Sequence, residues 1–224
     1  VFGLGGRVLE AIFGNMMVGS AVLGNVMHQE EIIMTNAPET LISRIFHTDL
    51  HDEDVISFRG LMKFSSYSGY SGSFRYAPVT SDAMYSSINR VYASFDAMQN
   101  QQMQGKKQFS VPYALRELGK LAPALCDDFF GESEQSTRSP YVTGYWGGGV
   151  FGGDIEYKFV IQLIAACVCG RKLVFSDHSN FISRHKVQQI ETKYKTCGAI
   201  AARFFALQHQ GRIGAKNTID KLLQ

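Results

Sequence analysis

Apolar and polar residues alternate along this chain in patterns that predict both strands and helices. Residues 89–97 alternate at period two, which predicts a strand. Residues 111–130 carry leucines at helical spacing, with Pro112 near the start, which predicts a helix. Further predicted strands cover residues 8–13, 55–58, 141–142 and 172–176, and further predicted helices cover residues 41–46, 155–169, 185–205 and 218–223. Strands that alternate with helices indicate an α/β fold with helices on both faces of the sheet.

The segments between these elements are polar or rich in glycine. Residues 64–74 combine Ser, Gly and Tyr and predict a strand followed by a loop, and residues 30–34 fit either a strand or the start of a helix. Residues 99–107 are expected to be an exposed connection, and residues 132–140 a polar linker.

The composition is that of one ordinary globular domain. The 224 residues are 45% hydrophobic and 19% charged, and the net charge is +2. No basic stripe with interleaved aromatics is present, which argues against direct DNA or RNA binding. No apolar run of about 20 residues and no signal peptide is found, so no membrane association is expected. The chain starts with Val1 inside an apparent domain, so we expect residues 1–224 to lack an N-terminal part of it.

Neither the cysteines nor the histidines predict a metal site. Cys126, Cys167, Cys169 and Cys197 show no spaced framework, so buried free thiols in an intracellular compartment, nucleus or cytoplasm, are expected. His47 and His51 stand four residues apart beside several carboxylates. Because no third ligand is anchored by rigid structure, a solvated loop is the favoured interpretation.

A glycine-rich segment, Thr143-Gly-Tyr-Trp-Gly-Gly-Gly-Val-Phe-Gly-Gly-Asp154, precedes the predicted helix 155–169. Its glycines let another molecule approach the main chain closely. Asp154 stands at the expected N-cap of the helix. Because free N–H groups and the helix dipole converge at such a point, the segment is a candidate anion site. More than a hundred residues upstream, Gln29-Glu30-Glu31 follows a run of small residues, 18–24.

These two segments, with Gln29-Glu30-Glu31 first along the chain and the glycine-rich segment second, resemble the catalytic domain of poly(ADP-ribose) glycohydrolases. Phe64-Ser-Ser-Tyr67-Ser-Gly-Tyr70 is similar to a tyrosine-rich element of that family, with Phe64 in place of its first tyrosine. Arg116-Glu117-Leu118-x-Lys120 resembles a further family helix. The resemblance runs from residue 1 to about residue 181, and it implies a macrodomain-like mixed sheet flanked by helices on both faces.

The resemblance also implies a hydrolase that cleaves ribose–ribose O-glycosidic bonds without metal or cofactor. Such cleavage needs an acid for the leaving oxygen and a base for water. In an extended segment Glu30 and Glu31 would point to opposite faces and could not act as an opposed pair. By resemblance, Glu31 is acid and then base, Glu30 helps to hold the ribose, and His178 falls near the aromatic that stacks adenine. The other implied substrate contacts are Asn15, Gly19, Gln29, Tyr70, Gly147, Gly149, Phe151, Gly152 and Gly153.

Several positions depart from the family pattern. Residues 19–21, Gly-Ser-Ala, stand where the family has three glycines, and a positive φ at Ser20 or Ala21 would cost about 1–2 kcal/mol. Ile12 replaces an aspartate and Tyr145 an asparagine. Two readings therefore stay open: an active glycohydrolase, or an inactive relative that reads ADP-ribose or serves as a structural subunit of a larger assembly. The presence of Glu31 favours the first, whose implied partners are poly(ADP-ribose) or ADP-ribose and ADP-ribosylated proteins.

Overall fold

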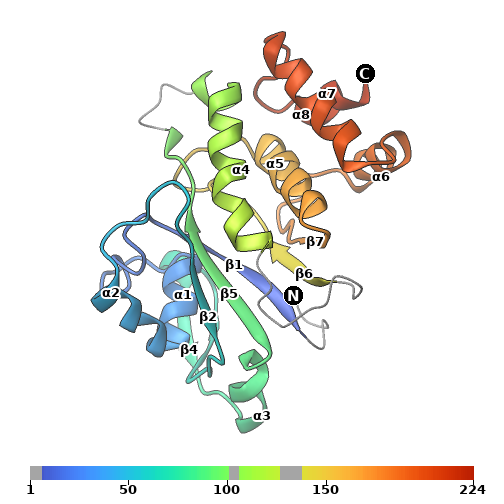
Figure 1. Ribbon diagram of the computed structural model, residues 1–224. Coiled ribbons are helices and arrows are strands. Elements are labelled where there is room, and N and C mark those ends of the chain that lie inside the picture. The colour runs from blue at the N-terminus through green and yellow to red at the C-terminus, as the bar shows by residue number, and fades with distance from the viewer. Residues whose placement is uncertain (1–6, 101–105, 127–137) are drawn as a thin grey trace.

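A mixed sheet of five strands, in the order β2-β5-β1-β6-β7, forms the centre of the protein (Figure 1). The structure is a computed structural model that describes residues 7–100, 106–126 and 138–224. Strands β5, β1, β6 and β7 run parallel, and β2 pairs with β5 antiparallel. The strands are β1 Val8–Gly14, β2 Ile56–Arg59, β5 Arg90–Asp96, β6 Arg138–Thr143 and β7 Arg171–Phe175.

Helices cover both faces of this sheet, which confirms the predicted α/β class. Helix α4, Val111–Cys126, and helix α5, Ile155–Val168, pack against each other on one face. Helix α1, Gln29–Asn36, lies on the other face. Helices α7 and α8 pack against α5, on the side of the sheet that α5 covers (Figure 1). The remaining elements are β3 Ser66–Ser68, β4 Arg75–Ala77, α2 Ser43–Phe46, α3 Ser81–Met84, α6 Arg184–Lys193, α7 Cys197–His209 and α8 Thr218–Leu223.

Alternating side chains of the central strands supply a separate core to each face. Leu9 and Ala11 of β1 belong to the larger core, which includes α4 and α5. Ile12 of β1 and Tyr92 of β5 belong to the smaller core, together with Met34 of α1. Because both faces of β1 are covered, most of its residues are buried, as its apolar sequence predicts.

The structure corrects several predicted boundaries. The helix predicted over residues 185–205 is two helices, because Thr196 caps a new start by accepting a hydrogen bond from the Ala199 amide. Residues 30–34, for which both a strand and the start of a helix stayed open, are helical. Strand β6 starts within the predicted linker, and Pro140, which has no N–H to donate, lies where the pairing with β7 shifts. Residues 101–105 and 127–137, which hold most of the predicted connection and linker and the end of the predicted helix 111–130, lie outside the described residues.

All four cysteines are paired, so the expectation of free thiols was wrong. Cys126 at the end of α4 is bonded to Cys169, with Cα atoms 4.9 Å apart. Cys167 is bonded to Cys197 at the start of α7, with Cα atoms 5.7 Å apart. The end of α5 is thereby tied to two neighbouring helices, and the free-thiol argument for a reducing compartment no longer applies.

Neither a membrane span nor a metal cluster is found in the described ranges. No helix there is both long and apolar enough to cross a membrane. No three His, Cys, Asp or Glu side chains come together there in a group that could hold a metal ion. His47 and His51 lie in exposed chain between α2 and β2.

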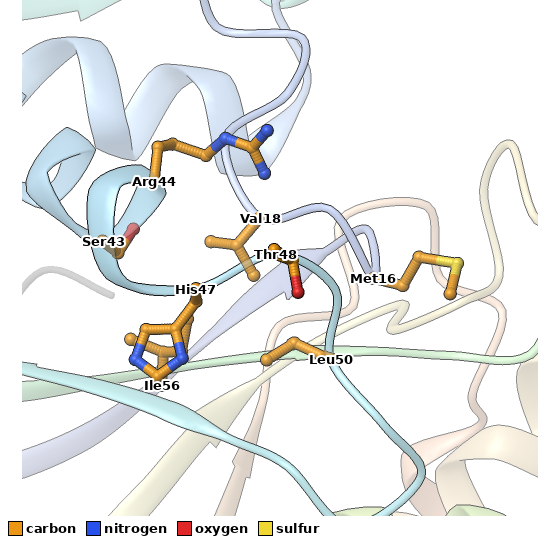
Figure 2. A pocket seen from close by; sticks show the side chains of 8 residues that line it. All are labelled: Met16, Val18, Ser43, Arg44, His47, Thr48, Leu50 and Ile56. Carbon is orange, nitrogen blue, oxygen red and sulfur yellow. The ribbon is translucent and has the colours of Figure 1, made fainter.

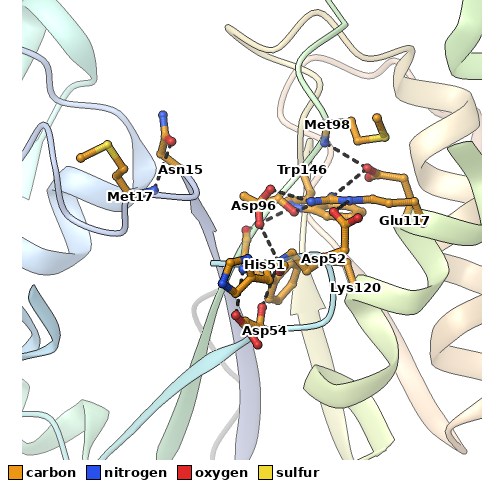
Figure 3. A network of polar contacts seen from close by, with 12 residues as sticks. Asn15, Met17, His51, Asp52, Asp54, Asp96, Met98, Glu117, Lys120 and Trp146 are labelled. Atoms are coloured by element: carbon orange, nitrogen blue, oxygen red, sulfur yellow. Dashed lines mark hydrogen bonds and ion pairs between the residues drawn. The ribbon is translucent and has the colours of Figure 1, made fainter. Parts of the chain in front are cut away.

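A network of charged side chains is buried where α4, α5 and β5 meet (Figure 3). Glu117 of α4 forms an ion pair with Lys158 of α5. Lys120 and Arg116 of α4 each lie 2.7 Å from the Asp96 carboxylate at the end of β5. Glu117 and Lys120 are 0% exposed and Lys158 is 1% exposed, so each of these buried charges depends on an opposite charge beside it.

The same network also holds two segments of the chain that lie outside the sheet. Lys120 donates hydrogen bonds to the backbone oxygens of His51 and Asp54 (Figure 3). Glu117 accepts a hydrogen bond from the Met98 amide at 3.0 Å. The exposed segment before β2 and the segment after β5 are therefore both held by α4.

Replacing Glu117 with Ala should lower the free energy of unfolding by about 3–5 kcal/mol, because Lys158 would be left buried without its partner. The double variant Glu117→Leu, Lys158→Met should lose less than Glu117→Ala, since it leaves neither charge of the pair behind. Urea unfolding measures both. A loss for Glu117→Ala no larger than that of the exposed control Glu53→Ala would contradict the buried pair.

Candidate active site

The loops that carry the predicted site residues leave the same edge of the sheet. Strands β1, β6 and β7 are parallel neighbours, and residues 15–28, 144–154 and 176–183 follow their carboxyl ends. In open α/β sheets, ligands bind outside the carboxyl ends of the strands. The fold therefore brings the segment before α1 and the glycine-rich segment, which are far apart in sequence, to one candidate site.

Gln29 fixes the start of α1 to β1. Its side-chain Nε2 donates to the Ala11 oxygen at 2.7 Å, and its Oε1 accepts from the Phe13 amide at 2.7 Å. Strand β1 pairs with β6 only through Leu9 and Glu10. Further along β1, the Gln29 side chain forms the hydrogen bonds that a neighbouring strand would otherwise form. Gln29 therefore positions the two glutamates that follow it.

Glu30 is held by backbone amides of the loop after β1. Its Oε1 accepts from the Gly19 amide at 3.0 Å and its Oε2 from the Asn15 amide at 3.3 Å. Burial raises the pKa of Glu30 to about 7, the Glu31 charge raises it too, and the two amides lower it. Near neutral pH this carboxyl group is therefore present in both its protonated and its ionised form.

Gly14 makes room for Glu30 at the end of β1. A Cβ atom at this position would lie 2.8 Å from Ser94 Oγ and 3.2 Å from Glu30 Oε1. The Ser94 hydroxyl is buried and has no hydrogen-bond partner among the described residues. Neither Gly14 nor Ser94 was among the predicted site residues, although the position of Gly14 directly before Asn15 is a signal for Gly14.

Glu30 and Glu31 lie in a helix and not in an extended segment, so the expectation that their side chains point to opposite faces does not apply. Both residues lie in the first turn of α1, where successive side chains are about 100° apart. Glu31 is 4% exposed, and its Oε2 accepts a hydrogen bond from the His28 amide at 3.0 Å. No described residue donates to its Oε1, whereas both oxygens of Glu30 are engaged.

Tyr70 reaches the start of α1 from the loop between β3 and β4. The Ser71 amide donates to the Met27 oxygen at 2.8 Å, which docks this loop, and the Tyr70 ring lies 5.7 Å from that of His28. Burial raises the pKa of Tyr70 and the Glu31 charge raises it further, while a hydrogen bond from the Gln29 backbone lowers it. The structure thus brings Tyr70 beside Glu31.

The altered Gly-Ser-Ala segment carries no backbone strain. Gly19 has a φ of +72°, which favours glycine, but neither Ser20 nor Ala21 is among the described residues with positive φ. Asn15 accepts a hydrogen bond from the Met17 amide through its side chain (Figure 3). Ile12 is fully buried and packs in the smaller core, so it is a structural residue.

Residues 144–154, called the glycine loop below, turn back on themselves before α5. The Gly153 amide donates to the Gly147 oxygen at 2.8 Å and the Gly152 amide to the Gly149 oxygen at 2.9 Å, so these two amides shape the loop. Within the described chain, no residue accepts from the amides of Gly147, Gly149 and Phe151. These three amides are available to an anion.

Asp154 confirms the predicted helix start. Its Oδ1 accepts from the Tyr157 amide at 2.9 Å, which caps α5, and its Oδ2 accepts from the Lys216 amide at 2.8 Å. Lys158 lies beneath the glycine loop, with Nζ 4.2 Å from the centre of the Trp146 ring. A Cβ atom at Gly147 would lie 3.0 Å from that Nζ, so the buried network supports the loop directly.

A small hollow lies beside the loop after β1 (Figure 2). It has no room for a water molecule. It lies between the loop after β1, helix α2 with the chain after it, and β2, and none of the predicted site residues lines it. Its lining residues are Met16, Val18, Ser43, Arg44, His47, Thr48, Leu50 and Ile56.

Comparison with known proteins identifies similar sequences. The chain matches the family described as Poly (ADP-ribose) glycohydrolase, Macro domain fold, over residues 4–184. It is 30% identical over 176 residues to Poly(ADP-ribose) glycohydrolase 1 of Caenorhabditis elegans, a match that covers 73% of this chain and 22% of that protein. It is 26% identical over 208 residues to Poly(ADP-ribose) glycohydrolase 2 of the same species, covering 87% and 42%. Probable poly(ADP-ribose) glycohydrolase 2 of Arabidopsis thaliana is 29% identical over 203 residues, covering 74% and 38%.

The match confirms the macrodomain-like sheet that the sequence resemblance implied. The aligned region spans about a fifth to two fifths of the length of the relatives it matches.

Replacing Glu30 with Gln should change how stability depends on pH. Because folding raises the pKa of Glu30 from 4.5 to about 7, its stabilising contribution is complete below pH 4.5 and is lost as the pH rises through about 7. Between about pH 5 and about pH 8 the unmodified chain should therefore lose roughly 1–3 kcal/mol relative to Glu30→Gln. Urea unfolding across this range measures the difference. Parallel pH profiles would refute it, and the exposed control Glu53→Gln should follow the unmodified chain.

Two glycines of the glycine loop should respond differently to alanine. Gly147 has a φ of +69°, and a Cβ atom there would lie 2.6 Å from the Ala97 Cβ, so Gly147→Ala should cost roughly 2–4 kcal/mol. Gly149 has open space around it, and Gly149→Ala should change stability by less than about 0.5 kcal/mol. Thermal unfolding compares the two variants, and equal effects would show that the loop has a different conformation.

Proposed function

Because this chain belongs to the poly(ADP-ribose) glycohydrolase family, we propose that it hydrolyses the ribose–ribose O-glycosidic bonds of poly(ADP-ribose). The observation that carries the proposal is the placement of Glu30 and Glu31 and of the glycine loop at one edge of the sheet, after β1 and β6 respectively. ADP-ribosylated proteins are the expected partners of such an activity.

The glycine loop is the proposed seat for the diphosphate of ADP-ribose. The amides of Gly147, Gly149 and Phe151 have no acceptor in the described chain, and the capped start of α5 adds its helix dipole. The net charge of +2 provides no strong long-range attraction for an anion. The local amides therefore supply most of the binding, and Lys158 below them is already paired with Glu117.

Glu31 is the proposed acid and base. It protonates the leaving ribose oxygen as the bond from the anomeric carbon breaks, and it then takes a proton from the water that adds to that carbon. One carboxyl group can serve both steps because they occur in sequence. The geometry favours Glu31 over Glu30 for this role, since Oε1 of Glu31 accepts no hydrogen bond from a described residue.

Glu30 is the proposed ribose-binding neighbour. Its carboxyl group is fixed by the amides of Gly19 and Asn15, and with a pKa of about 7 it can be neutral when substrate binds. In its neutral form it can donate a hydrogen bond to a ribose hydroxyl. The Glu31 charge raises the pKa of Tyr70, because the two side chains are close. The Tyr70 ring is therefore proposed to pack against the same ribose.

Replacing Glu31 with Gln should lower the release of ADP-ribose from poly(ADP-ribose) at least about a hundredfold, because the acid and base are lost. Gln retains an oxygen that can accept from the His28 amide, so calorimetric binding of ADP-ribose should change little. The exposed control Glu53→Gln should keep full activity.

Unchanged ADP-ribose release by Glu31→Gln would rule out the assignment of Glu31. Binding of ADP-ribose by the unmodified chain without any hydrolysis would instead support the reading as a non-catalytic ADP-ribose reader. Absence of binding at millimolar ADP-ribose would support a purely structural role in a larger assembly.

A further inference from the structure

Two loops at the candidate site leave the sheet in contact with each other. The Ser176 amide after β7 donates to the Thr143 oxygen at the end of β6, at 2.8 Å. A Cβ atom on Gly144 would lie 3.1 Å from the Ser176 oxygen. Residues 177–182, called the β7 loop below, therefore start directly beside the glycine loop.

Asp177 organises the β7 loop from within. Its Oδ1 accepts from the Phe181 amide at 2.9 Å and its Oδ2 from the Ile182 amide at 2.8 Å. The carboxylate also accepts a hydrogen bond from the Tyr145 hydroxyl, which in turn accepts from the Ser179 amide at 3.0 Å. Tyr145 belongs to the glycine loop, so its hydroxyl joins the two loops through a charged acceptor.

The Tyr145 ring also lies among aromatic side chains of the β7 loop. Its centre is 4.5 Å from that of His178 and 5.6 Å from that of Phe181. His178 is exposed and Phe181 is 54% exposed, so these rings present free surface beside the glycine loop. Aromatic faces of this kind bind nucleobases by stacking.

We propose that Tyr145 is a positioning residue for the nucleobase: its hydroxyl holds the β7 loop in place, so that His178 and Phe181 stand at the base end of a nucleoside diphosphate ribose seated on the glycine loop. The inference rests on the proposed function, which places the diphosphate on that loop. Within the described chain no hydrogen bond joins Tyr145 to Glu30 or Glu31, so loss of the hydroxyl acts on base binding and leaves bond cleavage unchanged.

The test is Tyr145→Phe in the otherwise unchanged chain, which keeps the ring and removes only the hydroxyl. ADP-ribose affinity by calorimetry should fall at least about tenfold, because the hydrogen bond to the Asp177 carboxylate and the one from the Ser179 amide are both lost, and KM for poly(ADP-ribose) should rise by a similar factor. The value of kcat should stay within about twofold. Inhibition by ribose 5-phosphate, which has no base, should also stay within about twofold.

Two further variants separate this role from general loss of stability. Tyr194→Phe removes a hydroxyl that bonds the Leu222 oxygen near the C-terminal helix, and it should leave ADP-ribose affinity unchanged. The double variant Tyr145→Phe, Asp177→Ala should lose less ADP-ribose affinity than the sum of the two single variants, because both single changes break the contact between Tyr145 and Asp177.

Two results would overturn the inference: unchanged ADP-ribose affinity of Tyr145→Phe, or an equal loss of affinity for ribose 5-phosphate. Binding of ADP-ribose by the unmodified chain without hydrolysis would refute the proposed glycohydrolase activity, while the binding measurements would still decide the role of Tyr145. No binding of ADP-ribose by the unmodified chain would overturn both proposals.

Discussion

The ion pair between Glu117 and Lys158 is the contact on which the candidate site depends most. Glu117 also accepts from the Met98 amide, and Lys158 lies against the Trp146 ring and beneath Gly147. The pair therefore joins α4, α5, the chain after β5 and the glycine loop. Two buried charges are stable only when both are present and correctly placed, so this pair restricts how these four parts can be arranged.

Backbone groups, more than side-chain charges, give the candidate site its chemistry. Amides of Gly147, Gly149 and Phe151 in the glycine loop have no acceptor in the described chain, and amides of Gly19 and Asn15 hold Glu30. Their positions depend on how the loops fold, and each loop is fixed at its base by a side chain: Gln29 at the end of β1, Lys158 below the glycine loop and Asp177 after β7. The anion site proposed for the glycine loop therefore does not depend on a high net charge of the chain.

Much of this arrangement could be predicted from the sequence, and the failures have identifiable causes. The apolar strands and the Asp154 cap depend on neighbours in sequence, and they were placed correctly. The buried charges of α4 were not expected, because periodicity treats Glu117 and Lys120 as a solvated face, while Leu115, read as part of the apolar stripe, is 56% exposed. The cysteine pairs join residues 43 and 30 positions apart, and only the fold brings them together.

The hydrogen bonds of Gln29 have a consequence for how this site can vary among related proteins. A side-chain amide that pairs with Ala11 and Phe13 behaves like one more residue of a neighbouring strand, and it anchors α1 directly to β1. The position of α1 on the sheet then does not depend on the loop of residues 15–28. Insertions or deletions near residues 20–26 would therefore leave the two glutamates in the same place relative to β1. That loop can therefore change in length and sequence without moving the two glutamates that we propose for catalysis and ribose binding.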